Sequence, residues 1–196
     1  MRARRFACLV RVSALAVTGV VALAQSPAPE KSGQAKLDAC SLIPKNEIEA
    51  VQGSPVKETK SSERSDGDFR VSQCFYTTAE FSRSVTLAVF QKSPPQESKR
   101  SPIEFWKHTF GRYAEKERAD KKEKETRETH EEEEGAPPRK IDDVGDEAFW
   151  VPNRFGGVLY VLKGDAFFSI SIGGADSEQV KIDKLKKLAA KVLRRF

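Results

Sequence analysis

The sequence predicts an α+β fold in which antiparallel strands, in one sheet or two, pack against helices in the order α-βββ-α-βββ-α, closed by one disulfide. Runs that alternate apolar and polar residues are typical of half-buried strands, and they come in two groups of three. Runs with apolar residues three and four positions apart, typical of amphipathic helices, precede, separate and follow these groups. An even number of cysteines remains after an export signal, which favours a disulfide.

The first 24 residues predict a secretory signal peptide. Arginines precede the apolar stretch Val12–Ala24, which ends in the small-residue pattern Ala22-Leu23-Ala24 of a cleavage site. The stretch is shorter than the roughly 20 apolar residues of a membrane span, so we expect cleavage before Gln25 and no stable span afterwards. No cysteine stands at Gln25, so a lipid anchor is not expected. The protein is expected to be extracytoplasmic, either periplasmic or secreted.

Removal of the signal leaves a chain of almost balanced charge. Four of the 34 Lys and Arg residues lie in the signal and all 29 Asp and Glu residues follow it, so 30 basic residues face 29 acidic ones, a net charge of +1. A nucleic-acid-binding protein needs a basic surface that displaces counterions from phosphates, and this class is therefore not expected.

Cys40 and Cys74 predict a structural disulfide, because a redox-active pair would show C-x-x-C spacing.

Residues 25–36 are small and polar and predict a disordered leader before a single domain at 37–196. A first helix is expected at 44–52, where Pro44 suits the first turn and Gly53 supplies a left-handed stop. Three alternating runs follow and predict an antiparallel meander: Pro55–Lys60, Phe69–Thr77 and Ser84–Gln91.

A second helix is expected to begin at Pro102, because Ser101 and Glu104 form a capping box around it. Its apolar side ends at Ala114. The segment 115–138 that follows is almost entirely charged before it reaches two prolines, so it has no apolar surface to bury. We expect a disordered insert that the fold does not need.

The second group of strands ends in a hairpin and a last helix. Its runs are Glu147–Val151, Gly157–Leu162 and Ala166–Gly173. A two-residue turn at Gly164-Asp165 sets the register of the hairpin, and cross-strand partners share a face. One face then holds Leu159, Val161, Phe168 and Ile170, which we assign to the core. The other face needs cover from a helix of this chain or from a bound partner, and we take it as a candidate binding face: Val158, Tyr160, Leu162 and Phe167, beside Ser169 and Ser171.

The last helix is expected to begin after Asp176 or Ser177. Its apolar stripe is predicted to face the core. Six basic residues are predicted to face water: Lys184, Lys186, Lys187, Lys191, Arg194 and Arg195. The members of this stripe are Val180, Leu185, Leu188, Ala189, Val192 and Phe196.

Short motifs in both halves resemble a family of bacterial exported domains of unknown function, best known among lipoproteins and other envelope proteins of actinobacteria. These motifs are Cys40-Ser41-Leu42-Ile43 with Glu47, Val51 and Gly53, then Cys74-Phe75-Tyr76, Val144-Gly145-Asp146-Glu147-Ala148-Phe149 and Lys163-Gly164-Asp165. The resemblance covers about residues 38–92 and 141–196. It implies an envelope domain with a disulfide between a helix and a strand, and it supplies no catalytic residues. This chain lacks the lipid-bearing cysteine of the lipoprotein members.

No catalytic, cofactor-binding or metal-binding set stands out. His108 and His130 are too few for a zinc site, which needs at least three spaced ligands. Asp142-Asp143 and Asp146-Glu147 lack the ligand alternation of a calcium loop, and turn chemistry accounts for them. The acidic run Glu131–Glu134 is typical of a solvated segment. No serine stands in a G-x-S-x-G elbow, although a triad assembled in space leaves no such motif.

These observations favour a non-catalytic binding or sensing module of the cell envelope or secreted space. Its expected partner is an envelope or secreted protein or a small ligand. One alternative is an extracytoplasmic hydrolase with a spatially assembled serine or carboxylate site, which a deep pocket with converging titratable groups would favour. A further alternative is an inhibitor or chaperone-like partner of another exported protein.

Overall fold

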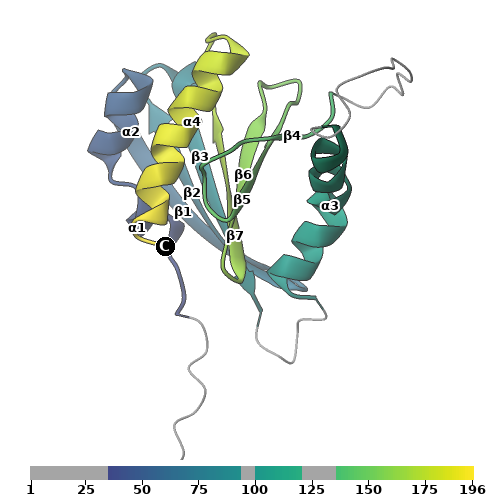
Figure 1. Cartoon of the computed structure of the whole chain (residues 1–196). Coiled ribbons are helices and arrows are strands. Elements are labelled where there is room, and N and C mark those ends of the chain that lie inside the picture. Colours follow the sequence, from purple (N-terminus) through teal and green to yellow (C-terminus); the bar gives the residue numbers. More distant parts are fainter. Residues whose placement is uncertain (1–34, 94–99, 121–135) are drawn as a thin grey trace, which may run out of the picture. The chain divides into compact units, whose positions relative to one another are not determined.

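Seven strands form one antiparallel sheet with helices on both of its sides (Figure 1). The computed structural model describes residues 35–93, 100–120 and 136–196, and Lys36–Phe196 forms one compact unit. The α+β fold class and the disulfide are confirmed. The expected signal peptide at 1–24, nearly all of the leader at 25–36 and most of the charged insert at 115–138 lie outside the described residues.

The first half contains two short helices and a three-stranded meander. The helices are α1 (Ala39–Leu42) and α2 (Lys45–Gln52), and the strands are β1 (Val56–Asp66), β2 (Phe69–Thr78) and β3 (Val85–Lys92), with the 3-10 turn η1 (Phe81–Arg83) before β3. Gly53 ends α2 in the left-handed conformation, at φ +66°, as expected. Strand β1 continues well beyond Lys60, because it stays paired with β2 as far as Asp66↔Phe69. The sequence did not predict this extension, because its residues are polar on both sides and show no alternation.

The described residues of the second half form one helix, four strands and a last helix. These are α3 (Pro102–Asp120), β4 (Arg139–Lys140), β5 (Glu147–Val151), β6 (Val158–Lys163), β7 (Ala166–Ile172) and α4 (Glu178–Leu193). The expected order is thus only roughly matched, since α1 and the two-residue strand β4 are additional elements. Helix α3 also runs past Ala114 into the charged segment, as far as Asp120.

The strand order in the sheet is β1-β2-β3-β7-β6-β5-β4, and every neighbouring pair is antiparallel. Pairing of β3 with β7, from Val85↔Ile172 to Gln91↔Ala166, joins the two halves. The register of the β6–β7 hairpin is the expected one, with Leu162 opposite Phe167 and Tyr160 opposite Ser169. The two predicted faces of this hairpin therefore exist.

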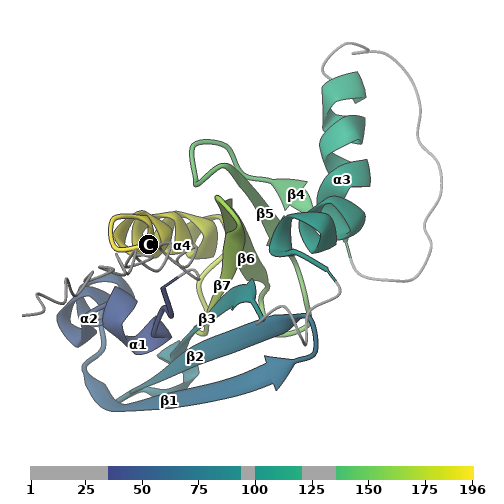
Figure 2. The same cartoon turned by 90° about the horizontal axis from the view of Figure 1, so that it is seen from below.

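The main core lies between the sheet and the layer of α1, α2 and α4, around which the sheet curves (Figure 2). The predicted core residues of the hairpin are all fully buried there: Leu159, Val161, Phe168 and Ile170. Leu185, Leu188, Ala189 and Val192 of α4 pack on them as expected, and Phe196 joins them partly buried. Val180 was assigned wrongly, because it is 43% exposed in the first turn of α4 and Ile182 is buried instead.

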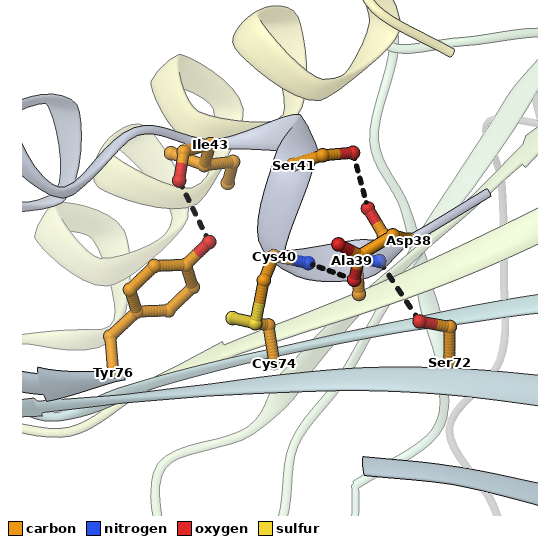
Figure 3. The surroundings of a disulfide bond; sticks show 8 residues. All are labelled: Asp38, Ala39, Cys40, Ser41, Ile43, Ser72, Cys74 and Tyr76. Carbon is orange, nitrogen blue, oxygen red and sulfur yellow. Dashed lines mark hydrogen bonds between the residues drawn. A yellow bond between two sulfur atoms is a disulfide. The ribbon is translucent and has the colours of Figure 1, made fainter. Parts of the chain in front are cut away.

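The N-terminal edge of the domain is clamped to β2 (Figure 3). Cys40 and Cys74 are disulfide-bonded with a Cα–Cα distance of 4.9 Å, as predicted. On the same face of β2, Ser72 Oγ accepts a hydrogen bond from the Ala39 amide at 2.9 Å. The Tyr76 hydroxyl donates to the Ile43 carbonyl at 2.8 Å. One covalent bond and two hydrogen bonds thus fasten the α1 segment to three alternate positions of one strand.

Candidate binding groove

Helix α3 is the single helix on the second side of the sheet within the described residues (Figures 1 and 2). It starts at the expected capping box, in which the Ser101 amide donates to Glu104 Oε2 at 2.7 Å and the Glu104 amide donates to Ser101 Oγ at 3.2 Å. Trp106, Phe110 and Ala114 repeat every four residues, lie on one side of the helix and are buried against the sheet. Local sequence thus sets both the start and the buried side of α3.

The surface beneath α3 consists largely of phenylalanines from β3, β5 and β7. Phe149 stacks on Phe110 with ring centroids 4.9 Å apart and an interplanar angle of 4°. Phe167 stacks on two rings, on Phe105 with centroids 5.4 Å apart and on Phe90 with centroids 4.4 Å apart. Ring pairs in this range add stabilisation beyond the area that they bury. Helix α3 is therefore held mainly by aromatic contacts.

One polar contact lies within this aromatic layer. The indole Nε1–H of Trp106 donates a hydrogen bond to Glu147 Oε2 at 2.6 Å, joining α3 to the first residue of β5. Trp106 is 2% exposed, whereas the Glu147 side chain is only partly buried. No ion pair of Glu147 is found among the described residues. The carboxylate is thus held in place by the indole without a cation.

Beside this contact, α3 and the sheet enclose an open groove of about 540 Å³. Its lining is mostly apolar, with Glu147 as the acidic side chain and Lys107 as the basic one. The residues that line it are Ile103, Trp106, Lys107, Gly111, Ala114, Glu147 and Leu162. The volume falls within the roughly 300–1,000 Å³ that is typical of sites for small ligands.

Gly111 lines this groove from the interior of α3. A Cβ added there would meet no atom within 4 Å, and the backbone conformation does not require glycine. Glycine destabilises a helix interior by about 1 kcal/mol relative to alanine. No contact among the described residues explains why a destabilising glycine stands at this position. The missing side chain does leave the groove wider than alanine would.

A smaller groove of about 230 Å³ lies on the other flank of α3. Phe105, Phe110 and Tyr113 of α3 line it, together with Val151 and Tyr160 of the sheet and three further residues. Burial raises the pKa of the Tyr160 hydroxyl above its usual value. This second groove is smaller and is bounded chiefly by aromatic rings.

The structure brings three of the four residues of the candidate binding face to α3. Phe167 is buried beneath the helix, Leu162 lines the larger groove and Tyr160 lines the smaller one. Val158, at the start of β6, is half-buried. A helix of this chain thus covers part of the face, and binding by the remainder stays a prediction.

Sequence reasoning missed Trp106, Glu147 and Gly111 as members of a site. Trp106 and Glu147 are 41 positions apart, so only the tertiary fold joins them. Gly111 did carry a local signal, because an isolated glycine inside an amphipathic helix needs an explanation.

The other polar candidates have structural roles or lie apart. Asp146 Oδ1 accepts from Lys163 Nζ at 2.8 Å, and Asp146 Oδ2 accepts from the Gly164 amide at 2.7 Å, so this carboxylate fixes the β6–β7 turn. These two contacts lower its pKa. His108 is exposed on α3, and His130 and Glu131–Glu134 lie outside the described residues. Within residues 35–93, 100–120 and 136–196, no three His, Cys, Asp or Glu side chains are grouped to hold a metal ion.

Comparison with protein-family models, with curated proteins and with solved structures finds no match to this chain. Among the helices in the described part of the chain, none has the length and apolar character needed to cross a bilayer. The fold and the groove therefore define the molecule at the level of its class, a disulfide-closed α+β domain with a partly covered aromatic face.

Proposed function

We propose that this protein is a non-catalytic binding module of the cell envelope or secreted space, which holds a small ligand in the groove between α3 and the sheet. The open space beside Gly111 carries the proposal. A helix that uses glycine where nothing is contacted is explained if a ligand occupies that space. The Cys40–Cys74 disulfide supports an oxidising, extracytoplasmic setting.

The ligand that fits the groove is apolar with one positively charged end. Ile103, Ala114 and Leu162 supply apolar walls. The partly buried Glu147 carboxylate, held by Trp106, offers a fixed negative charge without a cation of its own. Lys107 is exposed at the rim, where it is free to turn toward solvent. A ligand ammonium would therefore gain a charge-assisted hydrogen bond at Glu147.

A binding role is favoured over hydrolysis because the groove lacks a reactive set. Its titratable side chains are Glu147 and Lys107, and no serine, cysteine or histidine is among the described residues that line it. General-base activation of a nucleophile needs a base and a hydroxyl or thiol within hydrogen-bonding distance. The groove offers an acceptor and apolar walls, which suit recognition.

Three naphthalene derivatives test the proposal: naphthylmethylamine, naphthylmethanol and naphthoate. They share a ring system and differ in charge. The chain contains two tryptophans, so the Trp106 indole N–H gives one of only two such signals in a ¹⁵N-correlated NMR spectrum. We expect the amine to shift the Trp106 signal at the lowest concentration, the alcohol to bind about tenfold more weakly and the carboxylate to bind least.

Two substitutions and a control locate the ligand. Gly111→Leu places an apolar side chain in the groove, starting from a Cβ that meets no atom within 4 Å, and should abolish the shift. Glu147→Gln keeps an acceptor for Trp106 and should remove the preference for the amine over the alcohol. His108→Leu adds the same side chain to an exposed position of α3 outside the groove and should bind like the parent. Equal binding by the Gly111→Leu protein, or no shift with any of the three compounds, would contradict the proposal.

A further inference from the structure

The most exposed large apolar side chains of the described residues gather at one end of the sheet. Phe81 is 71% exposed, Phe155 is 75% exposed and Val180 is 43% exposed. They belong to η1, to the loop between β5 and β6, and to the first turn of α4. The strand register places all three segments at the same end, because Tyr76 pairs with Val85, Val85 with Ile172 and Val151 with Val158. Figure 1 shows these segments at the top of the view.

Two close contacts connect these segments, whose common surface we call the loop end. Gly173 lies so near the Ser82 carbonyl that a Cβ would clash, so η1 packs on the end of β7. Gly156 is similarly close to the Lys181 side chain, so the β5–β6 loop packs on α4. The segments that carry Phe81 and Phe155 are therefore both packed against the β7–α4 part of the domain.

The loop end carries unpaired positive charge. Its acidic side chains are already bound within the chain: Glu80 by Arg83 at 2.6 Å, Asp176 by Lys184 at 2.7 Å and Glu178 by Arg139 at 3.1 Å. Arg154 is exposed and makes no ion pair with any described residue. Lys181 also makes none, but this residue is only 8% exposed and lies against the β5–β6 loop, so Arg154 is the cation that this surface presents. The Arg154 guanidinium lies 4.8 Å from the centre of the Phe155 ring. A cation and an aromatic ring thus share one exposed loop tip.

We propose that the loop end docks on an anionic lipid surface, with Phe81 and Phe155 inserting among the headgroups. Apolar side chains flanked by cations are the features that bind proteins to the interface of a charged bilayer. A protein partner is less favoured, because the two phenylalanines stand on separate turns and line neither of the grooves described above. The proposal depends on this surface alone and is independent of the groove beneath α3.

Tryptophan reporters in the full chain test the proposal with vesicles of phosphatidylcholine, either pure or mixed with phosphatidylglycerol, whose acyl chains carry bromine. The first reporter is the Phe155→Trp substitution. The control is Arg194→Trp, at an exposed position just after the C-terminal residue of α4. The loop end contains the opposite end of that helix, so the control reporter lies away from it. We expect the mixed vesicles to quench the Phe155→Trp reporter strongly, the pure vesicles to quench it weakly and neither to quench the control. A reporter at this site distinguishes docking of the loop end from binding by the apolar N-terminal stretch.

Affinity measurements complete the test. Replacing both phenylalanines by alanine should weaken binding to the mixed vesicles at least tenfold, because each loses most of its apolar surface. Arg154→Ala should weaken it severalfold and reduce its salt dependence, whereas Arg194→Ala should leave the loop-end contact unchanged. Equal quenching of both reporters, or no quenching of either, would overturn the proposal. Protection of Phe155 by a protein partner in the absence of lipid would also overturn it and assign the loop end to that partner.

Discussion

The side of the sheet that carries α1, α2 and α4 buries an apolar cluster whose core members are each at most 5% exposed, and a disulfide fastens it. The side that carries α3 has one helix, a layer of aromatic rings and grooves of about 540 and 230 Å³ on the two flanks of that helix. Within residues 35–93, 100–120 and 136–196, three helices close the first side, whereas one helix covers the second only in part. The comparison indicates that stability resides mainly on the first side, and the ligand site that we propose lies on the second.

Truncation of one phenylalanine on each side gives the largest expected effect. Phe168→Ala, on the first side, removes a fully buried ring and should lower the free energy of unfolding by about 3–5 kcal/mol. Phe105→Ala, on the second side, removes a half-buried ring from α3 and should cost about 1–2 kcal/mol. Urea denaturation followed by circular dichroism measures both. Equal losses would contradict the division between the two sides.

Loss of the disulfide comes next. Cys40→Ser combined with Cys74→Ser opens a loop with a sequence separation of 34 residues and should lower the free energy of unfolding by about 3–4 kcal/mol. The same denaturation experiment measures the loss, and the parent protein in reductant serves as its control. Because the bond lies on the first side, ligand binding beneath α3 should persist under conditions in which the variant stays folded. Lost binding by a folded variant would show that the two sides are coupled.

Local sequence predicts each part of the molecule only as far as local interactions determine it. The end of α2 at Gly53 and the register of the β6–β7 hairpin were predicted correctly, because each depends on residues that are neighbours in the sequence. The pairing of β3 with β7 joins segments about 80 positions apart and leaves no local pattern. Strand β4 is too short to show a period. The contact of Trp106 with Glu147 was missed because it depends on how α3 crosses the sheet.

The clamp on β2 provides a smaller effect with a distinctive pH dependence. Tyr76→Phe removes the hydrogen bond to the Ile43 carbonyl and should cost about 1 kcal/mol at neutral pH. Burial, assisted by Asp38, raises the pKa of Tyr76 to about 12. The folded protein therefore keeps this proton at pH values where the unfolded chain, with a tyrosine pKa of about 10, loses it. This stabilisation is complete below about pH 10 and is lost as the pH rises toward 12.

The difference in stability between the parent and the Tyr76→Phe protein should accordingly shrink across that interval. Urea denaturation at about pH 8, 10 and 11 would measure it. Tyr113→Phe, which removes the hydroxyl of a half-buried tyrosine on the second side, is the matched control and should give a smaller difference. A constant difference for Tyr76→Phe over the three pH values would show that Tyr76 does not titrate in this way.

The smallest expected effect has the opposite sign and lies on the second side. Gly111→Ala should raise the free energy of unfolding by up to about 1 kcal/mol, because alanine restricts the unfolded chain and favours the helix. The added methyl group meets nothing within 4 Å, so no clash opposes the gain. The same methyl group enters the groove and should weaken binding of naphthylmethylamine by severalfold, less than Gly111→Leu does. Calorimetric melting and the NMR titration measure the two effects on one sample. A protein that is stabilised and also binds less well would show that glycine is kept here at the expense of stability for the sake of the open groove, whereas a destabilised protein would mean that the space beside α3 is already filled by the chain itself.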